Sequence, residues 1–290
     1  MRLSSSFGEY MKLSEINIYP IKSLKGVSLN EAKVEQRGLQ YDRRWMLVDD
    51  SGDFFTQREF PKMATIVIDL AENGLQVLTD GFEDLFIPFQ PSNDEKKIEV
   101  RVWQSVCDAI ESGDEINRWF SEVLQTKCRL VYMPDESRRE VNALFNRDDD
   151  IVSFADGYPF LVIGENSLSN LNSRLKNEVP MNRFRPNFVV QDSAAFAEDS
   201  WKKLSIGNTI FRVTKPCERC VMTTVDQQRG FFTGKEPLKT LATYRLSKDV
   251  FPHNFQSLDL KKNGVIFGQN LLAENFGETL KIGDEIKILA

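Results

Sequence analysis

The chain has 290 residues, 41% of them hydrophobic, which is enough to bury one large core or two cores of ordinary size. Two domains are the better expectation. The 43 acidic and 37 basic residues give a formal net charge of −6. Without a basic run, this balance argues against nucleic-acid binding as the main function. The longest apolar stretches, such as residues 160–163, are too short to cross a bilayer, so no membrane association is expected.

The cysteines and the single histidine restrict the chemistry further. The four cysteines are Cys107, Cys128, Cys217 and Cys220. Their number and spacing do not suggest a disulfide framework, and residues 1–15 lack the apolar core of a secretory signal. We therefore expect a cytoplasmic protein. The one histidine, His253, lies in a loop-like stretch, so a histidine-based triad and a two-histidine zinc site are set aside.

The first third of the chain is predicted to be rich in β-strands. Residues 1–12 are expected to be a loose extension. From residue 12 to about 112, six segments carry apolar or β-branched residues, several in alternation. These segments are residues 12–20, 27–36, 43–50, 63–70, 75–80 and 97–103. Turn signals at residues 50–53 and 72–74 separate short strands, which favours a barrel or a sandwich over a doubly wound sheet.

A helix is predicted next, from Asp114 as N-cap to about residue 125. Its apolar face is formed by Ile116, Trp119, Phe120 and Val123. The polar run at residues 134–150 is expected to be a long loop between domains. The second half is mixed. Strands are predicted at residues 160–164, 208–214, 220–226, 265–275 and 280–290, and helices at residues 166–175 and 237–246. Residues 205–213 and 281–289 resemble each other, which indicates two similar turns in one barrel.

The sharpest local feature is KPCERC at residues 215–220. Pro216 disfavours helix at Lys215, so the preceding strand is expected to end in a tight loop, and the alternation after Cys220 predicts another strand. A thioredoxin-type C-x-x-C opens a helix, so a following strand weakens the dithiol interpretation. A zinc site needs two more ligands, and the other cysteines and the histidine form no second close pair.

Two interpretations of this motif remain. In one, Cys217 and Cys220 are buried structural residues. In the other, which fits better, one thiolate flanked by Lys215 and Arg219 is a soft ligand for an electron-transfer metal. The same two cations would favour an anionic cofactor.

Several motifs, found in a fixed order, carry a family resemblance. KPCERCVMTTVD at residues 215–226, with RFRPN at 183–187 and VIFGQNL at 265–271, resembles the MOSC-domain proteins. IYPIKSLKG at 18–26 and GLQYDRRW at 38–45 resemble the β-barrel domain that precedes MOSC in one branch. That branch contains the mitochondrial amidoxime reducing component and the bacterial YcbX-type proteins. The resemblance runs from about residue 13 to residue 289.

The resemblance implies a mixed α/β, β-rich fold and a molybdenum cofactor (Mo-molybdopterin). A MOSC N-terminal β-barrel domain is expected over residues 13–130, and a MOSC β-barrel domain with peripheral helices over residues 131–290. Cys220 matches the molybdenum ligand of the family and is the expected catalytic residue. The expected cofactor-binding residues are Lys22, Ser23, Arg43, Gly157, Tyr158, Arg185, Asn187, Arg219 and Asn270.

The physical chemistry of these residues agrees with that implication. A pterin phosphate is a compact dianion, best held by cations together with hydroxyl or amide donors. Ser23 and Lys22 follow a strand and precede Gly26, where the chain can turn tightly. Arg185, between Phe184 and Pro186, would be costly to bury without an anion. Anchors in both halves imply a cofactor held across the domain boundary. We expect the anchoring cations to serve binding rather than the fold.

The implied function is the reduction of small N-hydroxylated compounds to amines or amidines, modified nucleic-acid bases among the candidate substrates. No pyridoxal phosphate is expected. YcbX-type proteins usually carry a C-terminal ferredoxin domain, and these 290 residues lack its cysteine spacing. Electrons are therefore expected from a separate ferredoxin- or flavodoxin-type carrier with its reductase, docking at a basic patch around Arg138, Arg139 and Lys215.

Two alternative functions and the choice of proton donor stay open at this point. The chain could be a sulfur carrier that holds a persulfide on Cys220. It could also be a module that stores or delivers the cofactor without turnover. Asp156, Glu218 and Asp226 are equivalent candidates for the proton donor.

Overall fold

The computed structural model of the chain describes residues 10–90, 96–147 and 149–290. The first nine residues of the expected extension, 1–12, lie outside these ranges. Its last residues are held in place: the Met11 carbonyl accepts a hydrogen bond of 2.8 Å from the Ile286 amide, and Lys12 begins the first strand. None of the helices in the described ranges has the length and apolar character that a membrane crossing requires.

The largest element is an eight-stranded sheet that takes strands from both halves of the chain. Its strands, in spatial order, are β18 (Ile286–Ile288), β14 (Lys203–Ile206), β15 (Thr209–Arg219), β16 (Val265–Ala273), β12 (Phe160–Gly164), β13 (Phe188–Gln191), β1 (Lys12–Ile18) and β2 (Val27–Leu29). β12 and β13 run parallel, whereas β1 runs antiparallel to β13. The first two strands of the chain therefore extend a sheet whose other six strands come from the second half.

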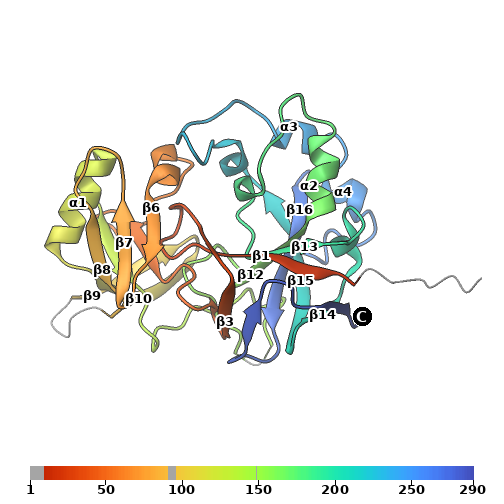
Figure 1. Cartoon of the computed structure of the whole chain (residues 1–290), viewed down its shortest axis with the longest axis horizontal. Helices are drawn as coiled ribbons and strands as arrows, with labels where there is room; N and C mark the ends of the chain where they lie inside the picture. Colours follow the sequence, from red (N-terminus) through yellow and green to blue (C-terminus); the bar gives the residue numbers. More distant parts are fainter. Residues whose placement is uncertain (1–9, 91–95, 148) are drawn as a thin grey trace, which may run out of the picture.

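Smaller sheets and the helices surround this one. The other sheets contain β5 (Trp45–Val48), β11 (Arg129–Tyr132), β10 (Ser105–Glu111) and β9 (Lys97–Val102); β17 (Thr279–Lys281), β3 (Glu31–Glu35) and β4 (Gly38–Leu39); and β6 (Val67–Leu70), β7 (Gly74–Leu78) and β8 (Leu85–Pro88). The α-helices are α1 (Asp114–Leu124), α2 (Glu165–Asn172), α3 (Leu238–Leu241) and α4 (Ser247–Val250). In Figure 1, α1 and β6–β10 form one lobe, and α2–α4 lie at the periphery of the other. The predicted mixed, β-rich fold with peripheral helices is confirmed.

Separate hydrophobic clusters support the two lobes. In the second lobe, Phe160 stacks on Phe188 at 5.7 Å between ring centroids, and Phe211 lies edge-on to both. In the first lobe, Trp45 and Phe120 are buried among the side chains of β6–β8. The expected division near residue 130 stays a prediction. Backbone hydrogen bonds cross that position, between β1 and β13 and between β3 and β17.

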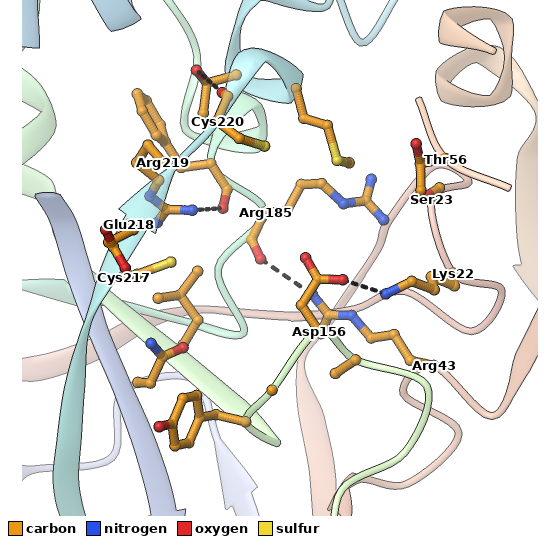
Figure 2. A pocket seen from close by; sticks show the side chains of 18 of the residues that line it. Lys22, Ser23, Arg43, Thr56, Asp156, Arg185, Cys217, Glu218, Arg219 and Cys220 are labelled. Atoms are coloured by element: carbon orange, nitrogen blue, oxygen red, sulfur yellow. Dashed lines mark hydrogen bonds and ion pairs between the residues drawn. The ribbon is translucent and has the colours of Figure 1, made fainter. Parts of the chain in front are cut away.

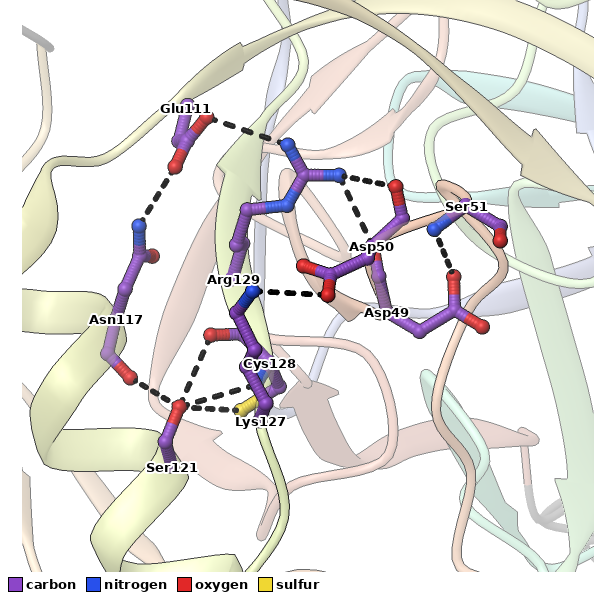
Figure 3. A network of polar contacts seen from close by, with 9 residues as sticks. All are labelled: Asp49, Asp50, Ser51, Glu111, Asn117, Ser121, Lys127, Cys128 and Arg129. Atoms are coloured by element: carbon purple, nitrogen blue, oxygen red, sulfur yellow. Dashed lines mark hydrogen bonds and ion pairs between the residues drawn. The ribbon is translucent and has the colours of Figure 1, made fainter.

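The predicted hairpin turn at residues 50–53 is confirmed. The Asp49 carboxylate accepts hydrogen bonds from the amides of Ser51 and Asp53 at 2.8 and 3.0 Å. Figure 3 shows this turn beside α1 and β11, where Arg129 donates to the carbonyls of Asp49 and Asp50. The helix that follows is also confirmed, but its N-cap is Gly113 and not Asp114. The two similar turns expected at residues 205–213 and 281–289 lie side by side, because β14 pairs with β18.

The prediction for residues 214–226 is wrong. Strand β15 does not end before Pro216 but runs on to Arg219, with register shifts on both sides of Pro216 that accommodate a residue without an amide proton. After Cys220 the chain forms a 3₁₀ turn, η4 (Val221–Thr224), instead of a strand. The hydroxyls of Thr223 and Thr224 donate to carbonyls three residues earlier, which favours this tight turn over an extended chain.

The remaining predicted elements differ mainly in length. The helix expected at residues 166–175 is α2, which ends at Asn172. Of the helix expected at residues 237–246, only the α3 segment is helical. The described residues of the run 134–150 form no helix or strand, apart from an isolated bridge between Glu140 and Ile151. Three further 3₁₀ turns are η1 (Pro61–Thr65), η2 (Met181–Arg183) and η3 (Ala197–Ser200).

Gly268 lies in β16 next to the paired strand β12, and we predict that replacing it with alanine destabilises the fold. Its φ is +81°, and a Cβ atom there would lie 2.8 Å from the Val162 carbonyl oxygen and 2.6 Å from the Ile163 side chain. Gly268→Ala should lower the free energy of unfolding by about 2–4 kcal/mol, measured by urea denaturation. Gly157→Ala is the control because it meets open space, and an equal effect of both variants would contradict the prediction.

Candidate functional site

One pocket brings together all ten residues that the sequence analysis assigned to a cofactor. It is lined by Lys22, Ser23, Arg43, Gly157, Tyr158, Arg185, Asn187, Arg219, Cys220 and Asn270, together with residues that include Thr56, Arg58, Asp156, Arg183, Cys217, Glu218 and Met222. In Figure 2, Cys217, Arg219 and Cys220 lie on one side of this pocket, and Lys22, Ser23 and Thr56 lie on the other. The placement of these residues is a finding, whereas their roles toward a cofactor stay predictions.

The lining of the pocket is strongly cationic. Its cationic residues are Lys22, Arg43, Arg58, Arg183, Arg185 and Arg219, and its carboxylates are Asp156 and Glu218. Six positive groups against two negative ones occur in a chain whose net charge is −6. Such a local reversal of charge is typical of a site for an anionic ligand.

Two of the arginines are held against one tyrosine ring. The guanidinium carbons of Arg43 and Arg185 lie 4.2 and 4.1 Å from the centroid of Tyr19. Arg43 also donates to the Asp42 carboxylate at 2.5 Å, and Asp42 accepts hydrogen bonds from the Tyr19 amide and from Asn187. Burial lowers the pKa of Arg185 to about 10, and repulsion by Arg43 adds to this. The cation pair is therefore preformed around a buried carboxylate.

Lys22 and Asp156 form the ion pair at the other side of the pocket. The Lys22 ammonium donates to Asp156 at 2.5 Å and to the Phe154 carbonyl at 2.8 Å, and it is almost fully buried. Burial lowers the pKa of Lys22 to about 8, against the opposing effect of Asp156. The Lys22 cation in turn holds the pKa of Asp156 well below its usual range. Asp156 is therefore an acceptor at neutral pH, and unsuited to donate a proton.

Beside Lys22, two hydroxyl groups and a guanidinium group face one corner of the pocket. Ser23 has a left-handed backbone (φ +67°), and Thr56 is buried beside it. Neither hydroxyl donates a hydrogen bond to another described residue, and Figure 2 shows the Arg185 guanidinium directed toward them. Phosphate oxygens accept hydrogen bonds from free hydroxyl groups and from cations of this kind.

The two cysteines differ in their surroundings. Cys220 is exposed, whereas Cys217 lies on β15 and packs against the hydrophobic cluster that contains Phe184 and Phe267. Burial raises the pKa of the Cys217 thiol. Between the two cysteines, Arg219 donates to the Phe267 and Phe184 carbonyls at 2.7 and 2.9 Å. Its third nitrogen, Nη2, is buried without a hydrogen-bond partner among the described residues, so it can donate to an anionic or carbonyl oxygen of a ligand.

The remaining predicted residues divide into open and occupied ones. A Cβ atom on Gly157 would meet no atom within 4 Å, and the Tyr158 hydroxyl is buried without a partner in the described chain. The side chain of Asn187, in contrast, donates to the Asn17 carbonyl and to Asp42, and it accepts from Arg43 and the Leu161 amide. The Asn270 amide donates to the Lys215 carbonyl. Asn187 therefore positions its neighbours, and its side chain has little capacity left for a ligand.

Sequence reasoning missed four polar residues of the pocket, Thr56, Arg58, Arg183 and Thr223. Thr56 and Arg58 come from a loop after the predicted turn at residues 50–53. Because no strand pattern or glycine motif marks this loop, its sequence looks like that of an ordinary surface loop. Arg183 belongs to the RFRPN motif, but it contacts the Thr223 carbonyl, Thr233 and Asp226 and so supports the segment after Cys220. Among the proton-donor candidates, Asp226 does not line the pocket.

The expected basic patch around Arg138, Arg139 and Lys215 is not formed. Arg139 is buried and donates to the carbonyls of Ser153, Ala155 and Asp156, which fixes the loop that carries Asp156. Lys215 is paired with Asp259 at 2.9 Å. These contacts are structural and leave no continuous cationic surface there.

Comparison with known proteins agrees with the fold and the motif order. Residues 10–127 match the MOSC N-terminal beta barrel domain, and residues 149–287 match the MOSC domain. Mouse mitochondrial amidoxime-reducing component 1 is 35% identical over 286 residues, which cover 96% of this chain and 82% of that protein. The chain belongs to the MOSC-domain family. Rat mitochondrial amidoxime reducing component 2 is 35% identical, with 94% of the present chain and 82% of the rat protein covered. Human mitochondrial amidoxime-reducing component 1 is 32% identical, with 96% of the present chain and 82% of the human protein covered.

We predict that the affinity of the pocket for a dianion decreases above pH 8. Lys22, with its pKa lowered to about 8, is cationic below that pH and loses its proton above it. The affinity for sulfate, whose charge is constant in this range, should then decrease by up to about tenfold per pH unit, measured by calorimetry between pH 7 and 9.5. Lys22→Arg should bind with little pH dependence, because arginine keeps its proton. A wild-type affinity that does not change with pH would contradict this.

We also predict that Arg43 stabilises the fold, in addition to any binding role. Arg43→Met would leave the Asp42 carboxylate, 0% exposed, without its charged partner. The free energy of unfolding of the ligand-free protein should decrease by about 3 kcal/mol. Arg58→Met is the matched control, because Arg58 faces the half-exposed Asp156 at 3.8 Å and should cost less than about 1 kcal/mol. An equal loss of unfolding free energy in both variants would contradict the role assigned to the Arg43–Asp42 pair.

Proposed function

We propose that the pocket binds a molybdenum–pterin cofactor (Mo-molybdopterin), that Cys220 is the protein ligand of molybdenum, and that the protein reduces N-hydroxylated compounds to amines or amidines. One observation carries this proposal: an exposed cysteine and a cluster of cations, predicted from separate motifs, line the same pocket. Membership of the MOSC-domain family supports the cofactor, and the names of the amidoxime-reducing relatives support the reaction.

The donors that are free in the pocket fit such a cofactor. Ser23, Thr56 and Lys22 would hold its phosphate, together with the Arg185 cation. Nη2 of Arg219 and the Tyr158 hydroxyl, neither of which has a partner in the described part of the chain, would contact the pterin. No group of three or more His, Cys, Asp or Glu side chains that could hold a metal occurs in the described ranges. The thiolate of Cys220 would therefore share the metal with ligands that the cofactor itself provides.

When bound, the group would supply the two-electron chemistry that breaks the N–O bond. The residues of the chain bind and orient the reactants. Asp156, kept ionised by Lys22, acts as a hydrogen-bond acceptor at the pocket. Arg183 holds the turn after Cys220 in place through the Thr223 carbonyl at 3.5 Å and Thr233 at 3.2 Å.

We propose further that electrons arrive from a separate ferredoxin- or flavodoxin-type carrier with its reductase, in a cytoplasmic setting. The 290 residues contain one histidine, no iron–sulfur cysteine spacing and no glycine fingerprint for a nicotinamide. The expected requirement is therefore an external donor. The substrate is a small molecule.

Metal analysis and turnover separate this proposal from its two alternatives. Protein produced with molybdate should contain close to one molybdenum per chain, and it should reduce an amidoxime with reduced methyl viologen as the donor. A persulfide on Cys220 in metal-free protein would instead indicate a sulfur carrier. Bound molybdenum without turnover would indicate a storage or delivery protein.

We predict that Cys220 and Cys217 are not equivalent. Cys220→Ser should abolish turnover with reduced methyl viologen, because it removes the exposed sulfur that would bind molybdenum. Cys217→Ser should keep most of the turnover, because Cys217 packs against the hydrophobic cluster of β16. The molybdenum content and the free energy of unfolding of each variant are the controls for loading and for folding. An equal loss of turnover in both variants, together with a redox-active dithiol formed by Cys217 and Cys220 in the wild type, would favour a redox pair.

A further inference from the structure

A short hairpin next to Cys220 holds apolar side chains in solvent. Val225 and Phe232 form an antiparallel bridge, and the Asp226 amide donates to the Phe231 carbonyl at 2.8 Å. Val221, the residue after Cys220, is 42% exposed, and Phe231 and Phe232 are 46% and 39% exposed. Hydrogen bonds from Thr233 to the Thr224 carbonyl, at 2.9 and 3.0 Å, join the hairpin to the turn that starts at Cys220.

The hairpin is fixed on both sides, so its apolar surface is a stable feature. At its tip Gly230 has φ +67°, and a Cβ atom there would lie 2.9 Å from the Thr65 side chain and 3.0 Å from Lys62 of η1. The loop that leads into α3 accordingly reaches the first lobe (Figure 1). On the pocket side, Arg183 binds Thr233 and Asp226. Two phenylalanines held rigidly in water are costly, which indicates a surface that another molecule covers.

The charge around these apolar residues is positive. Arg229 and Lys235, within the same segment, are exposed, and so is Lys239, four residues after Lys235. Of the acidic residues in the segment, Asp226 is paired with Arg183, so Glu236, which accepts from the Thr240 amide, is the one carboxylate there without a cationic partner among the described residues, against the three cations Arg229, Lys235 and Lys239. An apolar centre with a cationic rim is the usual composition of a surface that docks an acidic protein.

We propose that the surface formed by Val221, Arg229, Phe231, Phe232 and Lys235, called the hairpin surface below, docks the acidic protein that delivers electrons to the site. This rests on the proposed function. The reduction R–NHOH + 2 e⁻ + 2 H⁺ → R–NH₂ + H₂O requires two electrons, which two reduced ferredoxin- or flavodoxin-type carriers supply in succession, each being oxidised by one electron. The hairpin surface starts at the residue after Cys220, so a carrier bound there lies against the exposed side of the site.

Charge selects this occupant. The chain as a whole carries −6, so an acidic carrier is repelled elsewhere and attracted where the positive charges are concentrated. A small substrate has no need for a rim of exposed cations outside the pocket. A second copy of this chain would bring another hairpin surface of the same sign, which like-charge repulsion opposes.

The experiment uses the full-length, molybdenum-loaded protein with an acidic ferredoxin and its NADPH-dependent reductase. The apolar variant is Phe231→Ala with Phe232→Ala, and the charge variant is Arg229→Glu with Lys235→Glu. The matched control is Phe86→Ala with Phe276→Ala, which removes two phenylalanines of similar exposure, 47% and 58%, from other surfaces. Turnover is measured with the carrier and, separately, with reduced methyl viologen.

Both hairpin variants should raise the KM for the carrier by about tenfold, and the control should leave it unchanged. The charge variant should also lose the decrease in carrier-driven rate that added salt causes in the wild type. Turnover with methyl viologen should stay at the wild-type level in every variant. If the wild type is inactive even with methyl viologen, the proposed function fails and not the docking proposal alone.

Three results would overturn the docking proposal while leaving the proposed function intact. The first is an unchanged KM for the carrier in both hairpin variants. The second is a raised KM for the substrate with methyl viologen as the donor, which would make the hairpin surface part of a substrate path. The third is a wild-type dimer in solution that the apolar variant converts to a monomer, which would assign the surface to a second copy.

Discussion

A buried carboxylate is the constraint on which this pocket depends. Asp42 is fully buried and accepts hydrogen bonds from the Tyr19 amide, from Arg43 and from Asn187, which belong to both halves of the chain. Desolvation raises the pKa of Asp42, and the Arg43 cation opposes this. Without the charge of Asp42, Arg43 would lose its ion-pair partner, and the repulsion between the two guanidinium groups on the Tyr19 ring would be less well offset. The ionised Asp42 therefore fixes Arg43 and, through Asn187, joins the two halves of the chain.

The pocket is organised at a cost in stability of the ligand-free protein. Burial disfavours the charged forms of Lys22 and Arg185, which is why the pKa of each is lowered. Several donors, such as Nη2 of Arg219 and the Tyr158 hydroxyl, have no partner among the described residues. An anion that binds these groups relieves both penalties, so ligand binding and folding are coupled, and loading should raise the melting temperature. A site preformed in this way binds without reorganisation.

Much of this arrangement could be read from the sequence, and the exceptions have physical reasons. Alternating segments predicted the β-rich fold, and ordered motifs predicted the pocket residues, because short linear patterns encode both. The strand expected after Cys220 is a 3₁₀ turn, because the hydroxyls of Thr223 and Thr224 donate to backbone carbonyls three residues earlier. Thr56 and Arg58 were missed because only tertiary packing brings their loop to the pocket. Asn187 and Arg43 have structural roles because both bind Asp42. No pattern of residue spacing in the sequence identifies Asp42 as their partner.

The topology of the large sheet has a consequence for how the chain is made. Strand β1 pairs with β13, so a strand completed by Ile18 waits for partners that begin at Phe188, about 170 residues later during synthesis. One edge of β1 can pair with β2 early, but until then the edge that faces β13 has no native partner, and the side chains of Leu13, Ile16 and Ile18 lack most of their native cover. Contacts this distant in sequence slow folding and expose apolar surface in the meantime. The nascent chain therefore has a long interval in which chaperone binding competes with aggregation, and the first lobe can fold well before β1 is secured.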